Sequence, residues 1–400
     1  MLKMQMEVAQ IMKKKFLEIS NLGILQKHEG VREFAKELGE RRILWFYAEN
    51  FVSQLCKSLG ISPMSKDMKF YMEGYKGAYK TKGALILKDR FNIRYILGMY
   101  YEYKSDIGIY EPLDKLKVER IAYDYFSSEG EDLSSKECAE YLEQLRAKAM
   151  LEAHELNLHE KEGYIKLKNG LYTRGINYLS GHIKGHNSIT SIDTDFDREA
   201  ECPQWLEFID EVFNLYGEKE KEKAIGLLQE FMGYSLLLGN KYQKCLMLVG
   251  KPRTGKSVIL NTWENILGSK NVSSVPFEEL SQETKIGELL GKHINLSGEL
   301  ERGKKINTTL IKSLIGEDKV KGRYLYKNPF YFINGAKLVT AGNSLPHFDD
   351  ISGAMLERTL ILRLDNVVSP EKRDPNLKKQ ALERKERHLK MDAEGVREVN

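Results

Sequence analysis

The stretch Gly250-Lys251-Pro252-Arg253-Thr254-Gly255-Lys256-Ser257 decides the fold of this chain. It follows the apolar run Cys245–Val249 and precedes a helical pattern from Val258 to Leu267. A Gly-x-x-x-x-Gly-Lys-Ser/Thr sequence between a strand and a helix is the signature of a phosphate-binding loop. Its glycines let backbone N–H groups turn inward around phosphates, and the helix N-terminus adds partial positive charge. We therefore predict that this chain binds a nucleoside triphosphate through these eight residues.

Two side chains at the end of this loop have specific predicted roles. Lys256 is expected to reach the β- and γ-phosphates, and the Ser257 hydroxyl is expected to ligate Mg²⁺. ATP and Mg²⁺ are therefore the expected cofactors. A glycine-rich turn that matched the motif by chance would not need a strand before it and a helix after it.

Length and composition describe a globular protein of two or three domains. The 400 residues are 42% hydrophobic and 30% charged, which is ordinary for a folded protein. No apolar run approaches the roughly 20 residues of a membrane span, and Met1–Lys15 lacks the apolar segment of a signal peptide. We therefore expect a cytoplasmic protein without a membrane partner. The four scattered cysteines argue against a disulfide framework, and the net charge of +4 leaves a nucleic-acid partner open.

Three segments after the loop place a polar side chain beside an apolar strand. The strand His293–Glu299 ends in a carboxylate that could orient water and help hold Mg²⁺. The strand Ala336–Asn343 ends in an amide that could sense the γ-phosphate. Arg358 precedes another apolar run and could reach a neighbouring subunit's γ-phosphate. The candidate catalytic residues are Lys256, Glu299, Asn343 and Arg358, and the candidate metal ligands are Ser257 and Glu299.

The segment from Asp318 to Pro329 reads as a basic hairpin. No acidic residue lies between Asp318 and Asp349, a window that contains Lys319, Lys321, Arg323, Lys327 and Lys337. A basic hairpin without acids suits a phosphodiester backbone. It equally suits a solvated edge strand that lysines protect from pairing. The candidate nucleic-acid contacts are Lys319, Lys321, Arg323 and Lys327.

The part of the chain before the phosphate-binding loop is less informative. Lys66–Lys88 mixes tyrosines with lysines, a pattern that can stack bases, but we favour an amphipathic surface segment. Ser134 is a candidate helix N-cap. Pro203 suits a first helical position, and apolar residues at helical spacing continue to Ser235. We predict a helical region here.

The order of these elements resembles a superfamily 3 DNA helicase, of the kind found in phage and plasmid primase–helicases and poxvirus replication proteins. The resemblance covers about residues 165–365. Its pieces are Asn169-Gly170-Leu171, Ala200-Glu201-Cys202-Pro203-Gln204-Trp205, Gly233-Tyr234-Ser235-Leu236, the phosphate-binding loop, the strand ending at Glu299, Lys312-Ser313-Leu314, Gly316-Glu317-Asp318, Ala336-Lys337-Leu338, Asn343, Leu345-Pro346 and Arg358. It implies that Glu299 is the Walker B acid, Asn343 is sensor 1, Arg358 is an arginine finger, and the basic hairpin grips DNA.

The resemblance also implies an architecture. We expect an α/β fold with a P-loop AAA+-like ATPase core and a parallel central sheet, preceded by an α-rich (α+β) N-terminal region. The expected domains are an N-terminal region of unknown role at 1–130, a helical subdomain at 131–236, the ATPase domain at 237–366 and a charged helical tail at 367–400. Three features depart from the family: Ser297-Gly298 replaces a second carboxylate, the N-terminal part is too short and has no evident acidic metal cluster for a complete primase–polymerase, and the chain is short after Arg358.

The expected function is that of an ATP-dependent DNA helicase in the replication of a phage, plasmid or other mobile element. Its expected partners are single-stranded or forked DNA, further copies of the chain in a hexameric ring, and a separate primase or polymerase. It would act in the host cytoplasm. The alternative is a replication initiator or loader that ATP switches without strong unwinding activity, and strand displacement separates the two. A small-molecule kinase is disfavoured, because the basic hairpin and Arg358 serve no small acceptor.

Overall fold

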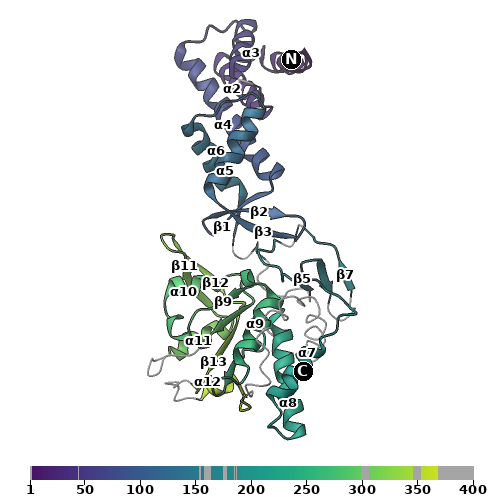
Figure 1. Cartoon of the computed structure of the whole chain (residues 1–400). Helices are drawn as coiled ribbons and strands as arrows, with labels where there is room; N and C mark the ends of the chain where they lie inside the picture. Colours follow the sequence, from purple (N-terminus) through teal and green to yellow (C-terminus); the bar gives the residue numbers. More distant parts are fainter. Residues whose placement is uncertain are drawn as a thin grey trace. The chain divides into compact units, whose positions relative to one another are not determined.

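The computed structural model divides the chain into two compact units (Figure 1). It describes residues 2–43, 45–152, 155–156, 164–173, 178–183, 185, 187–298, 306–345 and 353–367. The first unit comprises Met1–Tyr103 and Pro112–Leu151, and the second comprises Lys104–Glu111 and Glu152–Asn400. Among the described residues, no helix is long and apolar enough to cross a membrane.

Helices dominate the first unit. The chain order is α1 (Leu2–Ile19), α2 (Ile24–Glu40), α3 (Trp45–Ser58), α4 (Ser65–Arg90), β1 (Ile93–Ile96), β2 (Met99–Lys104), β3 (Ile109–Leu113), α5 (Lys115–Ser128), α6 (Ser135–Ala149) and β4 (Met150–Leu151). The four strands form one sheet in the order β3-β2-β1-β4. As predicted, Ser134 caps α6, because its hydroxyl accepts a hydrogen bond from the Glu137 N–H.

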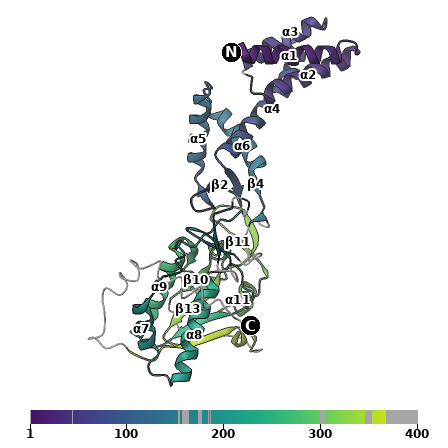
Figure 2. The same cartoon turned by 90° about the vertical axis from the view of Figure 1, so that its right-hand side faces the viewer.

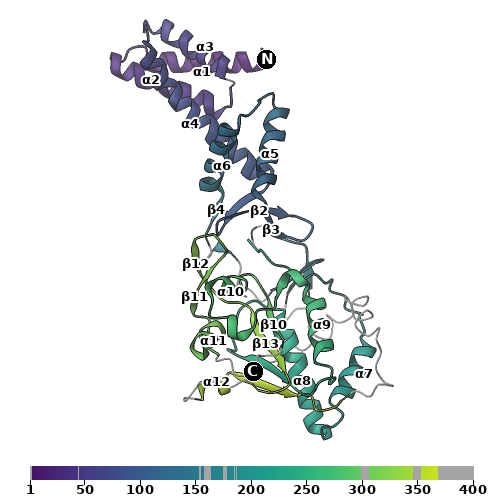
Figure 3. The same ribbon diagram turned by 60° about the vertical axis from the view of Figure 1, so that its left-hand side comes forward.

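Helix α4 extends from α1–α3 toward α5 and α6 (Figures 2 and 3). It contributes to two hydrophobic clusters of this unit, one shared with α1–α3 and the other with β1, α5 and α6. Tyr71 and Tyr75 on α4 are buried, and the Tyr75 hydroxyl donates to the Ile43 carbonyl at 2.6 Å. The lysines Lys69 and Lys76 are exposed. The segment is thus amphipathic, as favoured, but Tyr71 and Tyr75 pack into the core of the unit rather than lying on its surface.

The second unit begins with a small sheet and two helices. The antiparallel strands β5 (Tyr164–Leu167), β6 (Gly170–Thr173) and β7 (Tyr178–Ser180) form the sheet. Helix α7 (Pro203–Val212) has Pro203 in its first turn, and α8 (Glu218–Ser235) follows it. Both helices were predicted from apolar periodicity. Their buried faces join the core of the five-stranded sheet of this unit.

A five-stranded parallel sheet forms the centre of the second unit, which confirms the predicted fold class. In chain order its strands are β8 (Cys245–Val249), β9 (Val272–Ser273), β10 (Ile294–Ser297), β13 (Lys337–Gly342) and β14 (Thr359–Arg363). Their order in the sheet is β14-β8-β13-β10-β9. The strand before the phosphate-binding loop therefore lies inside the sheet, between β14 and β13.

Helices cover both faces of this sheet. In all three views, the sheet lies between α9 (Lys256–Leu267) and α11 (Thr308–Ile315). The short helices are α10 (Glu283–Gly287) and α12 (Ala354–Glu357), and 3₁₀ turns cover Ser269–Asn271 and Phe277–Glu279. Strands β11 (Lys319–Arg323) and β12 (Pro329–Ile333) form a separate antiparallel hairpin, as predicted. Glu299 and the tail 368–400 lie outside the described residues.

Candidate nucleotide and nucleic-acid sites

The phosphate-binding loop connects the carboxyl end of β8 to the amino end of α9. Both of its glycines are enclosed by neighbouring chain segments. A Cβ on Gly250 would lie 2.1 Å from the Leu364 carbonyl oxygen, and one on Gly255 would lie 3.0 Å from both Phe208 Cζ and Val212 Cγ2. Any side chain at Gly250 would collide with backbone. Helix α7 therefore packs directly against the loop, a contact that the sequence did not reveal.

The backbone of the loop has the conformation of an anion-binding turn. Arg253 has φ 71° and Gly255 has φ 92°, both in the left-handed region. Such alternation turns successive N–H groups toward one side, where they can surround an anion. Helix α9 has twelve residues, so its N-terminus contributes partial positive charge at the same place. These residues fit a triphosphate.

Hydrogen bonds hold the ammonium of Lys256 inside the curve of the loop. Its Nζ donates to the Gly250 carbonyl at 2.5 Å and to the Lys251 carbonyl at 2.8 Å. The buried Thr254 hydroxyl also donates to the Lys251 carbonyl, at 2.9 Å. The loop thus carries a positive charge at the point where the motif predicts the β- and γ-phosphates.

The tip of β13 lies beside the loop. The Gly250 N–H donates to the Gly342 carbonyl at 3.1 Å, which brings the next residue, Asn343, close to the start of the loop. Asn343 is exposed. On the other side of β13, the Thr340 hydroxyl donates to the Gly298 carbonyl at 3.2 Å, just after β10. The structure thus brings Lys256 and Asn343 to one edge of the sheet.

The candidate metal ligands are only partly described. Ser257 is exposed in the first turn of α9, next to Lys256. Glu299, the other candidate, lies outside the described residues. Within the described ranges, no group of three or more His, Cys, Asp or Glu side chains could hold a metal ion. The Mg²⁺ site therefore stays a prediction from the motif.

Arg358 lies at the opposite end of the sheet from the loop. It precedes β14, which pairs with β8 so that Thr359 is opposite Cys245, and its carbonyl accepts from the Cys245 N–H at 2.9 Å. Five strand residues at about 3.3 Å each separate Cys245 from Gly250, or roughly 16 Å. The guanidinium donates to Gln243 Oε1 at 3.3 Å and to the Ala354 carbonyl at 3.4 Å. Arg358 therefore has no part in the phosphate site of its own chain.

The β11–β12 hairpin has one buried face and one basic face. Val320 and Phe332 are buried, whereas Lys319, Lys321 and Arg323 alternate with the buried positions and are exposed. Lys327, in the connecting loop, is exposed as well. The hairpin was predicted from its composition, and its alternation puts three of the four candidate nucleic-acid contacts on one surface.

Helix α10 supplies an acid that the sequence window did not reveal. Figures 1 and 3 show α10 beside the hairpin, and a Cβ on Gly322 would lie 3.0 Å from Gly287 Cα. This close approach lets Glu283 form a 2.8 Å ion pair with Lys321. The hydrogen bond from Lys321 lowers the pKa of Glu283 below its usual value. The hairpin sequence contains no acid after Asp318, but Glu283 of α10 lies next to its basic face in the fold.

Lys337 corrects the interpretation of the basic window. It is fully buried at the start of β13, where its ammonium donates to the Leu237 carbonyl and lies 4.4 Å from the centre of the Tyr234 ring. Burial, with Lys337 nearby, also lowers the pKa of His293 to about 3. Lys337 was counted with the cations suited to a phosphodiester backbone, and its burial makes that wrong. It fastens the central sheet to the end of α8.

Comparisons with known proteins agree with this fold. Residues 248–358 match a domain family of unknown function, DUF5906. Among solved structures, the chain is similar to an apo structure of the NrS-1 C-terminal region, with a TM-score of 0.54 and 14% sequence identity over 80% of this chain and 71% of that chain. A second apo structure of that region matches with a TM-score of 0.53, 14% identity, and coverage of 80% and 72%. Over about 80% of its length, the chain thus resembles the NrS-1 C-terminal region in fold.

Proposed function

We propose that this chain is an ATP-dependent DNA helicase of the superfamily 3 type, acting as a ring on single-stranded DNA during replication of a phage, plasmid or other mobile element. One observation carries the proposal. A phosphate-binding loop lies at the carboxyl edge of a parallel sheet, while a basic hairpin with an exposed face forms a second surface in the same unit. A nucleotide site and a separate polyanion site suit an enzyme that couples hydrolysis to movement along a nucleic acid.

Each residue of the nucleotide site has a proposed task. Lys256 would neutralise the β- and γ-phosphates of ATP, and the backbone from Gly250 to Gly255 would orient them. Bound Mg²⁺ would supply charge neutralisation to the phosphates, and Ser257 and Glu299 would hold it. Asn343 would contact the γ-phosphate from the tip of β13. Glu299 would orient water, so that Glu299→Gln would keep nucleotide binding and lose turnover; hydrolysis at the wild-type rate in that variant would remove Glu299 from this role.

The position of Arg358 supports a role in a neighbouring subunit. Since it lies roughly 16 Å along the sheet from its own loop, a contribution to hydrolysis requires the site of another copy. Arg358→Ala and Lys256→Ala would each be inactive alone. Mixed rings would regain activity at interfaces that combine an intact Lys256 with an intact Arg358. The two variants could assemble together and still regain no activity. In that case, either Arg358 only holds β14 against the preceding helix, or the ring needs every site intact. Wild-type protein titrated with Lys256→Ala decides between these, because only the second predicts a steep loss.

The experiment that tests the proposed function is ATP hydrolysis with and without single-stranded DNA. We expect DNA to stimulate hydrolysis and Lys256→Ala to abolish it. Wild-type protein should also displace a strand from a forked duplex. Stimulated hydrolysis without displacement would favour the initiator or loader. Hydrolysis that DNA leaves unchanged would contradict a helicase.

A further inference from the structure

Two exposed tyrosines belong to the basic hairpin. Tyr331 on β12 is 63% exposed, and Tyr326 in the loop between the strands is 94% exposed. The inner face of the hairpin is packed through Val320 and Phe332, so neither ring is required for that packing. An aromatic ring left in water beside several cations is a typical element of surfaces that bind unpaired nucleotides.

Tyr331 lies at the centre of the basic face. Its register partner is Lys321, directly across the antiparallel pair, and Lys319 and Arg323 are the diagonal neighbours on the same face. Side chains at directly opposed positions lie about 5 Å apart at Cβ, and diagonal ones lie about 7–8 Å apart. The spacing between successive phosphates in a single strand is of similar size. A base on the Tyr331 ring would therefore leave its flanking phosphates within reach of these cations.

Tyr326 occupies a backbone position that is unfavourable for its side chain. It has φ 59°, and the Lys327 N–H donates to the Tyr324 carbonyl at 3.0 Å, which closes a four-residue turn with Tyr326 third. Glycine or asparagine is favoured at a third turn position with positive φ, and another residue costs about 1 kcal/mol. A tyrosine that is almost fully exposed in a strained conformation suggests a function outside the fold.

We propose that Tyr331 and Tyr326 stack on the unpaired bases of a single-stranded nucleic acid while Lys321 and Arg323 pair with its phosphates. The inference deepens the proposed function and rests on it. Bases in a duplex cover both of their faces by stacking on each other, so this surface selects single strands over duplexes. Stacking tolerates all four bases, since each has a π-face, and the surface therefore reads no sequence.

The test compares binding of the full chain to single-stranded DNA and to an abasic strand of equal length. Wild type should prefer the strand that carries bases. Tyr331→Ala should lose at least about fivefold in affinity for that strand and bind the abasic strand as before, because base stacking on an aromatic side chain is worth this much or more. Tyr331→Phe should retain the preference, since it keeps the ring. Equal losses in the Ala and Phe variants, or none in either, would overturn the assignment of Tyr331.

Tyr326→Asn provides the second arm and separates binding from folding. Asparagine tolerates the left-handed conformation, so the melting temperature should stay the same or rise while affinity for the base-carrying strand falls. Leu325→Ala, at the neighbouring exposed position, is the matched control and should leave affinity unchanged. Wild-type affinity in Tyr326→Asn would remove Tyr326 from the surface. If single-stranded DNA stimulates wild-type hydrolysis but neither tyrosine matters, the proposed function stands and this inference fails.

Discussion

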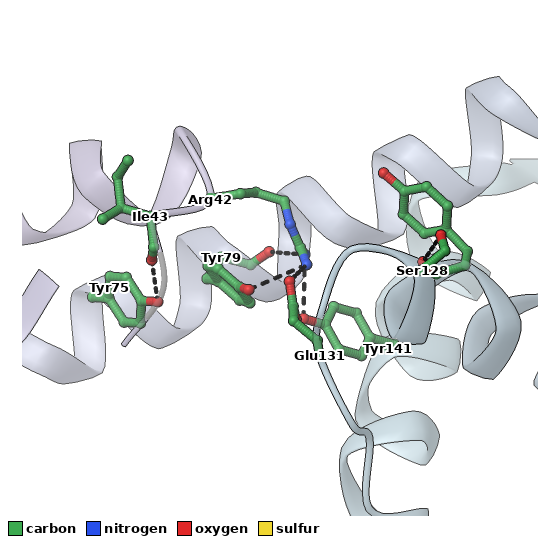
Figure 4. A network of polar contacts seen from close by, with 8 residues as sticks. Arg42, Ile43, Tyr75, Tyr79, Ser128, Glu131 and Tyr141 are labelled. Carbon is green, nitrogen blue, oxygen red and sulfur yellow. Dashed lines mark hydrogen bonds and ion pairs between the residues drawn. The ribbon is translucent and has the colours of Figure 1, made fainter. Parts of the chain in front are cut away.

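The first unit contains a cluster, here called the Arg42 cluster, that combines the same residue types as the β11–β12 hairpin but points them inward. It consists of Arg42, Tyr79, Glu131 and Tyr141, which Figure 4 shows, together with the ring of Phe126. The side chains of Arg42 and Glu131 are only 12% and 16% exposed. On the hairpin, by contrast, Lys321 and its neighbour Tyr331 face solvent. Cations beside tyrosines thus occur in this chain in two opposite settings.

Protein hydrogen-bond partners and aromatic rings surround the Arg42 guanidinium. Arg42 donates to the Tyr79 carbonyl and hydroxyl, each at 3.3 Å, and to the Tyr141 hydroxyl at 3.2 Å, and it forms an ion pair with Glu131. The Tyr79 and Phe126 rings lie 4.0 and 4.7 Å from its central carbon. Burial raises the pKa of Tyr141 to about 12 despite the nearby cation, so its hydroxyl stays neutral at physiological pH.

The difference shows how burial decides what a basic and aromatic group of residues can do. The Arg42 guanidinium is mostly buried and paired with a mostly buried carboxylate, so a ligand has little access to it, and removing it leaves the Glu131 charge uncompensated. An exposed cation loses little free energy when it leaves a solvated ion pair, so it can turn toward a phosphate. The Arg42 cluster is therefore a structural joint between the α2–α3 connection and the α4–α6 region. The cations and Tyr331 of the hairpin are exposed to solvent instead.

The strongest test of this comparison is Arg42→Ala. It leaves Glu131 without its cation in a mostly buried place, and breaking such a pair costs about 3–5 kcal/mol. Hydrogen exchange resolved by peptide should show faster exchange in α2 and α4 and no change in α9. The control is Arg41→Ala, which removes exposed ion pairs to Glu7 and Glu37 and should cost about 1 kcal/mol or less. Equal losses of stability in Arg42→Ala and Arg41→Ala would show that the Arg42 cluster does not hold these helices together.

Gly83→Ala tests the packing of the Arg42 cluster by adding a methyl group beside it. A Cβ on Gly83 would lie 2.4 Å from Arg42 Nη1 and 2.5 Å from Tyr141 Cε1, so the cluster must shift. Overpacking of this kind costs about 1–3 kcal/mol. Gly77→Ala, in the same helix, is the matched control because its Cβ would meet nothing within 4 Å. That variant should stabilise the protein by about 0.5–1 kcal/mol through helix propensity. A Gly83→Ala protein with raised thermal stability would contradict tight packing around Arg42.

The features set by short stretches of chain could be predicted from the sequence. The strand, loop and helix around Gly250–Ser257 follow from one motif, and Thr308–Ile315 forms the predicted helix. Contacts between distant residues could not be predicted this way. Arg42 and Glu131 are 89 residues apart. Lys321 and Lys337 have the same charge in the same window, and only tertiary packing exposes one and buries the other.

Lys321→Ala combined with Arg323→Ala tests the outward-facing half of the comparison. On single-stranded DNA, each lost phosphate contact lowers the slope of log affinity against log salt by about 0.7, so the double variant should lower it by about 1.4. Affinity for single-stranded DNA should fall roughly ten- to hundredfold at 0.1 M salt. The control, Lys285→Ala, removes a cation that Glu279 and Glu288 already hold on α10, and its slope should match wild type. An unchanged slope in the double variant would make the hairpin a protected edge strand.

Glu283→Gln should have the smallest effect and the opposite sign. In the free protein Glu283 holds Lys321, and a phosphate must compete with this carboxylate for the same ammonium. Glutamine removes the charge at nearly equal size, so affinity for single-stranded DNA should rise roughly two- to fivefold, the range of an exposed ion pair. The gain should shrink as salt screens the pair. Because Lys321 lowers the pKa of Glu283, the carboxylate stays ionised at neutral pH, and a change from pH 6 to 8 should not imitate the substitution.

Glu288→Gln is the matched control for this last prediction. Glu288 lies just after α10 and pairs with Lys285, away from the cations of the hairpin. A gain of affinity in Glu283→Gln alone identifies Lys321 as a cation that DNA competes for, and a damaged fold does not produce such a gain. Equal gains in both variants would reflect only the change in net charge. Weaker binding in Glu283→Gln would mean that the carboxylate positions Lys321 for DNA. The exposed cation Lys321 would then depend on a carboxylate of the protein, as Arg42 depends on Glu131.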